Sequence, residues 1–336
     1  MTNRDYMALM NEGCTYMQNY HDLLRATMER GVDEFNTRTG KTCRALVGYQ
    51  LQYDLREGFP ALTTRKLPIK NIVGELLGFF RGYDSAADFR VLGCAFWDQN
   101  ANETPAWLAN PYRGDQHDFL GRIYGKQWTD WRDRRIAVSE SQRDEMLTRG
   151  YIDTMYDPLQ NVWLMERGIN QLEEALRKLI IDPSDRRIIV SAWRPDEFDM
   201  MALPPCHMDY RFVAFTNPRV LNVVVTLRSW DLFLGGPANI ASTSIFLAIM
   251  ARLAGFEAGV VTLQATNAHI YADHFDQVRE LLERSHIGAP RLTLSDNIKQ
   301  IAHLKQIHGA FERLEPADIV LQGYESHAAI KAPMAA

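Results

Sequence analysis

The chain of 336 residues has no long apolar run, and this absence excludes two classes of protein. Its longest apolar stretches, such as 223–227 and 245–250, are far shorter than the ~20 residues that cross a bilayer. The N-terminal residues form no continuous apolar signal core. We therefore expect neither a membrane protein nor a secreted one, and we predict a cytoplasmic location.

Cysteine and net positive charge are also scarce. Cys14, Cys43, Cys94 and Cys206 lie far apart and form no C-x-x-C pair, so the sequence indicates neither a metal site nor a disulfide framework. A reducing compartment fits this pattern. Acidic residues outnumber basic ones by 42 to 37, which gives a net charge of −5. Because a bulk nucleic-acid binder is normally basic, we expect no dedicated nucleic-acid binding.

What the chain does have is a globular composition, with 46% hydrophobic and 24% charged residues. Helical and strand patterns are interspersed without a regular βαβ alternation. We therefore predict a single mixed α/β (α+β) domain over residues 1–336, with a large sheet packed against a long helix. The expected helices are 14–30, 69–81, 161–179 and 240–253, and the expected strands are 44–53, 187–193, 209–215, 220–227, 260–264 and 319–321.

Three further segments have a distinct composition. Residues 100–122 are rich in Pro, Gly, Asn and Asp and predict a long loop. Residues 132–160 are strongly charged and predict a solvated excursion. Residues 220–227 are apolar at nearly every position, which predicts a strand that is buried on both faces.

Cys206 is the first candidate for chemistry, because it follows two prolines and precedes His207. A small buried core residue is the ordinary interpretation of a free cysteine. The alternative is a thiolate nucleophile whose pKa is lowered by nearby cations. The Cys-His pair is weak evidence alone, since adjacent strand residues face opposite ways.

Several arginines are candidates for binding an anion. Arg228 and Ser229 follow the strand 220–227, at the rim of the predicted sheet, where a guanidinium can clamp a phosphate. Arg38 lies in a polar turn, and Arg186 and Arg187 form a pair. An isolated arginine pair more often lies on a solvated face, so both interpretations stay open.

Four polar residues complete the candidates. Asn239 precedes the helix 240–253, where it can cap the helix or present its amide to the edge of a uracil ring. His269 and Tyr271 share one face if the chain is extended there. Glu75 lies in an apolar helix, either as an exposed charge or as a buried carboxyl that moves protons.

In their order along the chain, these segments resemble the motifs of the thymidylate synthase superfamily. The resemblance covers about residues 20–280 and the last ~15 residues, and an extra charged stretch near 132–165 interrupts it. It implies a thymidylate-synthase-like fold with a large twisted mixed sheet, one face of which makes a homodimer. The matching segments are Glu75, Y-G-K-Q-W at 124–128, Arg186-Arg187, P-P-C-H at 204–207, R-S-x-D at 228–231, G-x-P-x-N-I-A-S at 235–242 and H-x-Y at 269–271.

The resemblance implies transfer of a one-carbon unit from 5,10-methylenetetrahydrofolate to C5 of a pyrimidine nucleotide. Cys206 would add to C6 of the ring and so make C5 nucleophilic. Glu75 would move protons, and Tyr124 would lie near the reacting base. The catalytic set that the resemblance implies also includes Asn239 and Asp231. Nucleotide binding is implied for Arg38, Arg228, Ser229, Asn239, His269 and Tyr271, with Arg186 and Arg187 contributed by the second subunit, and folate binding for Asp231, Trp97 and Leu203.

The residue at 239 also bears on the choice of base. Relatives that use cytosine carry Asp at this position, whereas this chain keeps Asn239. A site that matches one hydrogen-bond pattern leaves polar groups unpaired with the other base, at a cost of about 1–3 kcal/mol per group. The expected nucleotide is therefore dUMP.

Departures from the family pattern gather on the folate side. The synthases usually carry Phe where Ala238 stands, an aromatic residue where Asn100 stands, Asp where Asn267 stands, and His and Trp where Gly74 and Gly78 stand. Smaller side chains suggest a looser, wetter pocket, in which water rather than hydride reaches the C5 methylene.

The leading prediction is therefore a phage-type dUMP hydroxymethylase that makes 5-hydroxymethyl-dUMP for modified DNA and releases tetrahydrofolate. The alternative is a thymidylate synthase that makes dTMP and dihydrofolate, because other side chains can refill the space. A CMP or dCMP hydroxymethylase, or a silent relative that binds a nucleotide or RNA, fits less well.

Overall fold

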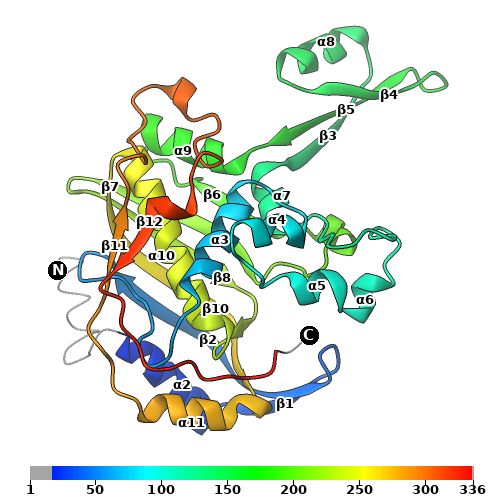
Figure 1. Ribbon diagram of the computed structural model, residues 1–336. Helices are drawn as coiled ribbons and strands as arrows, with labels where there is room; N and C mark the ends of the chain where they lie inside the picture. Colours follow the sequence, from blue (N-terminus) through cyan, green and yellow to red (C-terminus); the bar gives the residue numbers. More distant parts are fainter. Residues whose placement is uncertain (1–16, 335–336) are drawn as a thin grey trace.

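The computed structural model describes residues 17–334, and its largest element is a seven-stranded sheet (Figure 1). Strand β10 runs parallel to β8 and β9, whereas the other neighbours are antiparallel. The predicted mixed α/β class is therefore confirmed. Along the sheet the order is β1 (Val32–Asn36), β2 (Lys41–Asp54), β10 (Glu257–Tyr271), β8 (Arg219–Leu227), β7 (His207–Thr216) and β6 (Ile189–Ser191), with β9 (Trp230–Asp231) beside β10.

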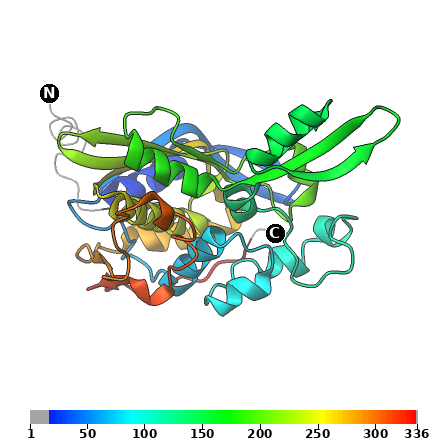
Figure 2. The ribbon, with the colours of Figure 1, turned by 90° about the horizontal axis from the view of Figure 1, so that it is seen from above.

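Helices gather on one face of this sheet (Figure 2). They include α2 (Gln18–Arg30), α3 (Ile69–Phe80), α9 (Gln171–Ile181) and α10 (Gly235–Ala254). Helix α10 ends, as predicted, at Gly255, whose φ of 73° is the left-handed conformation that glycine adopts readily. Three predicted helices correspond to α2, α3 and α10, and residues 14–16 of the first lie outside the described residues.

Among the described residues, α10 alone is long and apolar enough to cross a bilayer by length and composition. Most of its side chains are buried inside the protein, where they contact β8, β9 and β10. It is the core helix of this fold, and it positions the loop before its first turn.

The second face of the sheet is open in the single chain. In β8, Val223, Val225 and Leu227 are buried, but the residues between them are only half-buried. The prediction that this strand is buried on both faces is therefore wrong for one chain taken alone. On the open face Gln52 Nε2 donates to Thr262 Oγ1 at 3.1 Å, and Gln264 Nε2 donates to Gln50 Oε1 at 3.1 Å.

The charged segment forms an arm that projects from the body (Figures 1 and 2). It consists of β3 (Trp131–Ala137), α8 (Glu140–Thr148), β4 (Ile152–Asp157) and β5 (Val162–Ile169), with the sheet order β3-β5-β4. A small core of Ala137, Tyr151 and Met165 holds it together. The predicted solvated excursion is thus a folded sheet.

Two sequence predictions fail at its borders. The expected helix 161–179 is strand β5 followed by α9, because Asn170 caps α9 by accepting from the backbone N–H groups of Leu172 and Glu173. The expected loop 100–122 contains the end of α5 (Asp98–Asn102) and all of α6 (Pro105–Leu108).

The remaining elements are short. They are α4 (Ala86–Val91), α7 (Tyr124–Thr129), α11 (Phe275–Glu283), β11 (Arg291–Leu294), β12 (Ile319–Gln322) and the 3-10 turns η1 (Pro195–Met200), η2 (Ala272–His274), η3 (Leu304–Gln306) and η4 (Pro316–Asp318).

Candidate active site

Cys206 lies at the start of β7, in a loop that is fixed from two sides. Arg228 donates from Nε and from its guanidinium NH₂ to the carbonyl oxygens of Pro205 and Pro204, both at 2.8 Å. The backbone N–H of Cys206 donates to the Tyr124 hydroxyl at 2.6 Å, and its carbonyl accepts from the Arg228 N–H at 3.0 Å. These hydrogen bonds hold the backbone of Cys206, and the residue itself is only half-buried.

His207 points into the core rather than toward the thiol's open side. Its ring lies 6.0 Å from that of Tyr124 and 5.9 Å from that of Tyr210, measured between centroids. Burial lowers the pKa of His207 to about 4, so the imidazole is neutral at neutral pH. The sequence neighbour of Cys206 is therefore not a charged partner of its thiol.

Glu75 approaches the same region from α3. The carboxyl is half-buried, and Trp97 Nε1 donates to its Oε1 at 3.1 Å. Burial raises the pKa of Glu75 to about 7, although the bond from Trp97 acts in the opposite direction. A carboxyl with this pKa can both give and take a proton at neutral pH.

Aromatic rings enclose this carboxyl. Tyr124 stacks on Phe79 with centroids 4.9 Å apart, and Trp97 meets Tyr124 edge-on at 5.9 Å. Burial and the nearby Cys206 sulfur raise the pKa of Tyr124 well above its ordinary value, so the phenol stays neutral. Sequence reasoning missed Phe79, whose position in an apolar helix indicated nothing beyond a core residue.

His269 and Tyr271 lie on one face of β10, as predicted, with ring centroids 5.1 Å apart. His269 Nδ1 is 2.8 Å from Asn267 Oδ1, so this departure from the family pattern orients the imidazole. Burial lowers the pKa of His269 and raises that of Tyr271 to about 12. Arg38, in the β1–β2 turn, is near enough to act on Tyr271 in the opposite direction.

Asp231 and Asn239 flank the start of α10. Asp231 Oδ1 accepts from the N–H groups of Phe233 and Leu234 at 3.0 and 3.2 Å, which shapes the turn into the helix. The helix begins at Gly235, so Asn239 lies inside it and is not its N-cap. The capping interpretation of Asn239 is therefore wrong. Leu203 and Ser229 are half-buried next to the loops of Cys206 and Arg228.

Arg186 and Arg187 are not brought to Cys206 within one chain. Ile189 pairs with Arg211, which places Arg187 beside Val213, seven residues along β7 from Cys206. At ~3.3 Å per residue this separation is about 23 Å. Both arginines are exposed, and Arg187 Nε donates to Asp185 Oδ1 at 2.8 Å.

The expectation of a looser folate side is contradicted on α3. A methyl carbon added at Gly78 would collide with the ring of Phe89. One added at Gly74 would lie 2.6 Å from the carbonyl oxygen of Leu92. The volume absent from these two glycines is therefore occupied by the segment that packs against α3, and no extra space follows from them. Ala238 is half-buried and packs against the core.

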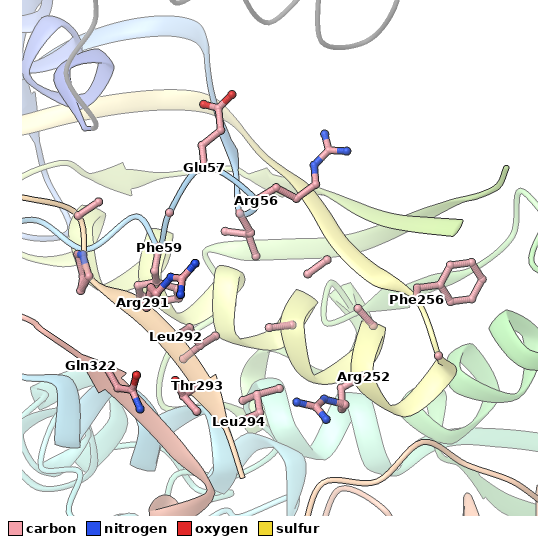
Figure 3. A pocket seen from close by; sticks show the side chains of 18 of the residues that line it. Arg56, Glu57, Phe59, Arg252, Phe256, Arg291, Leu292, Thr293, Leu294 and Gln322 are labelled. Atoms are coloured by element: carbon pink, nitrogen blue, oxygen red, sulfur yellow. The ribbon is translucent and has the colours of Figure 1, made fainter. Parts of the chain in front are cut away.

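A cavity of about 900 Å³ lies elsewhere, at the C-terminal end of α10 (Figure 3). Arg252, Arg291 and Phe59 are among its lining residues. Because the 20 residues of α10 span about 30 Å, this cavity is remote from the start of the helix, where Asp231 and Asn239 lie.

Among the residues from 17 to 334, no group of three or more His, Cys, Asp or Glu side chains could hold a metal ion.

Comparison with known proteins agrees with this geometry. The sequence profile of the thymidylate synthase family matches residues 18–336. A thymidylate synthase of Pseudomonas putida is 40% identical over 324 residues, which cover 95% of this chain and all of that protein. Those of Bordetella parapertussis and Pseudomonas syringae pv. tomato are 38% and 37% identical over 325 and 324 residues, with the same coverage of both chains. The chain therefore belongs to the thymidylate synthase family.

Proposed function

We propose that the protein is a thymidylate synthase, which converts dUMP and 5,10-methylenetetrahydrofolate into dTMP and dihydrofolate. The observation that carries this choice of product is the close packing on the face of α3 next to Glu75, where Phe89 and Leu92 occupy the volume absent at Gly74 and Gly78. The names of the relatives, which match over their whole length, support it too. At Gly74 and Gly78 the structure does not have the extra space that motivated the hydroxymethylase prediction, and the names of the relatives give no support to a role in DNA modification.

The first steps use Cys206 and Glu75. The Cys206 sulfur adds to C6 of the uracil ring, which turns C5 into an enolate carbon that attacks the one-carbon unit of the folate. The C5 proton must then leave, and tetrahydrofolate must be expelled to give an exocyclic methylene. Glu75, with its pKa of about 7, is suited to move protons at O4 and C5 at neutral pH.

The last step is a hydride transfer. Tetrahydrofolate gives hydride to the methylene, the Cys206–C6 bond breaks, and the products are the methylated base and dihydrofolate. A pocket without bulk water is required, since water adding to the methylene would give the hydroxymethyl product. Trp97, Asp231 and Leu203 are the proposed contacts to the folate.

Binding of dUMP uses groups from several elements. Arg38, Arg228 and Ser229 bind the 5′-phosphate, because guanidinium groups bind phosphate oxygens strongly. His269 and Tyr271 bind the 3′-hydroxyl of the sugar. The Asn239 amide oxygen accepts from N3–H of the base, and its NH₂ group donates to O4.

The distance of Arg186 and Arg187 from Cys206 argues for a homodimer. Neither arginine reaches the thiol of its own chain, which is about 23 Å away along β7. The open face of the sheet is partly apolar at its end, where Val213 and Phe215 are 44% and 49% exposed. We infer that a second copy covers this face and brings its arginine pair to the phosphate. A reduced thiol at Cys206 also fits the cytoplasm.

The test is a product analysis. The enzyme is incubated with dUMP and 5,10-methylenetetrahydrofolate, the nucleotide is weighed by mass spectrometry, and dihydrofolate is followed by absorbance. One dihydrofolate for each methylated nucleotide is expected. A hydroxymethylated nucleotide without dihydrofolate would refute the proposal. In a parallel incubation with 5-fluoro-dUMP and the folate, a covalent adduct is expected at Cys206, and a Cys206→Ala variant should form none.

A further inference from the structure

The face of α3 that carries Gly74 and Gly78 is packed unusually closely. The two glycines are four residues apart and therefore lie on one side of the helix. Against them lies the segment from Phe89 to Cys94, with the Phe89 ring at Gly78 and the Leu92 carbonyl at Gly74. Phe89 is fully buried. The Phe89 ring thus fills the space that a side chain at position 78 would occupy.

From this position the Phe89 ring supports Trp97. Their ring centroids are 6.1 Å apart with the planes inclined by 33°, and Phe89 meets Phe79 edge-on at 5.6 Å. Trp97 in turn donates its indole N–H to Glu75. The contacts therefore run from Gly78 through Phe89 and Trp97 to the carboxyl of Glu75.

We propose that Phe89 is a positioning residue that decides the product of the reaction. It holds Trp97 against Glu75 and keeps the wall beside the exocyclic methylene free of water-sized gaps. The inference rests on the proposed function, because it concerns the fate of the methylene in that reaction. Phe89 does not itself touch the reacting atoms.

The exocyclic methylene at C5 can react in two ways. Hydride from tetrahydrofolate gives a methyl group, oxidises the folate to dihydrofolate and releases the thiolate. Addition of water gives a hydroxymethyl group, releases the thiolate and a proton, and leaves tetrahydrofolate unoxidised. The yield of dihydrofolate per dUMP consumed therefore measures which fate prevails.

The test variant is Phe89→Ala. Removing the ring leaves a cavity behind Trp97, because protein cores relax only partly around such losses. We expect the yield of dihydrofolate per dUMP consumed to fall several-fold and hydroxymethyl-dUMP to appear in its place, with little change in the KM for dUMP. A purely structural role would lower the amount of active enzyme and leave this ratio unchanged.

Two further variants separate these cases. Phe311→Ala removes an equally buried ring that packs on Phe80, so it should lower stability without changing the ratio. Phe89→Ala combined with Gly78→Phe places a ring in the same space from α3 and should restore dihydrofolate formation. If the ratio stays at the parental value in Phe89→Ala, the inference is wrong.

The parent enzyme serves as the reference for the proposed function itself. If the parent already forms hydroxymethyl-dUMP, the proposed function fails, whatever the variants do. If the parent forms dTMP and Phe89→Ala does so with the same ratio, only the inference about Phe89 fails. Should Phe89→Ala not fold, Phe89→Leu retains part of the volume, and an unchanged ratio in that variant would count against the inference equally.

Discussion

The arm and the candidate active site both contain arginines, but their environments are opposite. In the arm, Arg134 Nε donates to Glu166 at 2.8 Å and Arg135 Nε donates to Asp133 at 3.0 Å. At the candidate active site, Arg228 gives hydrogen bonds to two backbone carbonyls. Within residues 17–334, no carboxylate pairs with Arg228, Arg38 or Arg186.

The difference indicates which arginines are available to bind an anion. An arginine that is already paired with a carboxylate would have to lose that partner before binding a phosphate. An unpaired guanidinium keeps its positive potential for a ligand. The net charge of −5 conceals this local excess, and so does the local sequence, because both regions contain an Arg-Arg pair.

The largest expected effect tests whether Arg186 and Arg187 act across a dimer. Cys206→Ala and the double variant Arg186→Ala/Arg187→Ala should each be nearly inactive. When they are mixed and allowed to exchange subunits, half of the dimers contain one intact site. Recovery of about a quarter of the parental activity is therefore expected in a dimer with shared sites, measured as dihydrofolate formation.

A matched mixture gives the control for this complementation. Cys206→Ala mixed with Arg228→Ala should recover nothing, since both residues act in the site of their own chain. Recovery in both mixtures, or in neither, would contradict the assignment of Arg186 and Arg187 to the partner's site.

The next effect compares one arginine from each region. Arg228→Lys removes the two hydrogen bonds that hold the Pro204–Pro205 carbonyls, because lysine cannot reproduce the planar fork. Loss of about 10²-fold in kcat/KM is expected, corresponding to two or more charge-assisted hydrogen bonds. Arg134→Lys in the arm should change kcat/KM by less than about twofold, since exposed ion pairs contribute little. Equal losses of kcat/KM in the two variants would contradict the distinction between Arg228 and the carboxylate-paired arginines of the arm.

A third prediction concerns Glu75, a carboxyl whose environment favours its neutral form. Burial raises the pKa of Glu75 from 4.5 to about 7, so the folded chain binds this proton more tightly than the unfolded chain. Stability contributed by the neutral carboxyl is therefore present below pH 4.5 and is lost as the pH rises through 7. Glu75→Gln should inactivate the enzyme and yet stabilise it.

The expected gain at pH 8 is about 2 kcal/mol, less than the full pKa shift implies because the carboxyl is partly open to solvent. It should shrink toward zero as the pH approaches 4.5. Denaturant titrations at several pH values measure it. Glu312→Gln, which alters an exposed carboxyl, should show no such dependence. If Glu75→Gln is less stable than the parent at pH 8, the idea that the environment of Glu75 favours the neutral carboxyl is wrong.

Local patterns in the sequence predict several placements within this candidate site. The alternation of His269 and Tyr271 on one face of β10 and the left-handed end of α10 at Gly255 follow from rules that act within a few residues. The resemblance added the order of the motifs. The mixed sheet and the proximity of Tyr124 to Cys206 agree with these expectations.

What could not be predicted depends on contacts between distant segments. Whether Gly78 leaves a gap depends on the ring of Phe89, which no local pattern places there. The 23 Å between Arg187 and Cys206 depends on the register of β6 on β7. Strand β5 resembled a helix in sequence because a short apolar run is ambiguous until its partners, β3 and β4, are known.

The smallest effect should come from the arm. Asp133 accepts hydrogen bonds from Arg135, Arg167 and Tyr151, and its side chain is only 15% exposed. Asp133→Asn keeps the shape but removes the charge that these groups share. A loss of about 1 kcal/mol is expected in the local stability of the arm, in the range of partly exposed ion pairs and hydrogen bonds. Faster hydrogen exchange of backbone amides in β3 and β5 measures this loss.

Asp144→Asn alters a far more exposed carboxylate and serves as the control. Because neither residue belongs to the unpaired cationic site, kcat and KM should stay at parental values in both. A marked fall in kcat for Asp133→Asn alone would mean that the arm and the active site are energetically coupled, and the contrast between the two regions would then need revision.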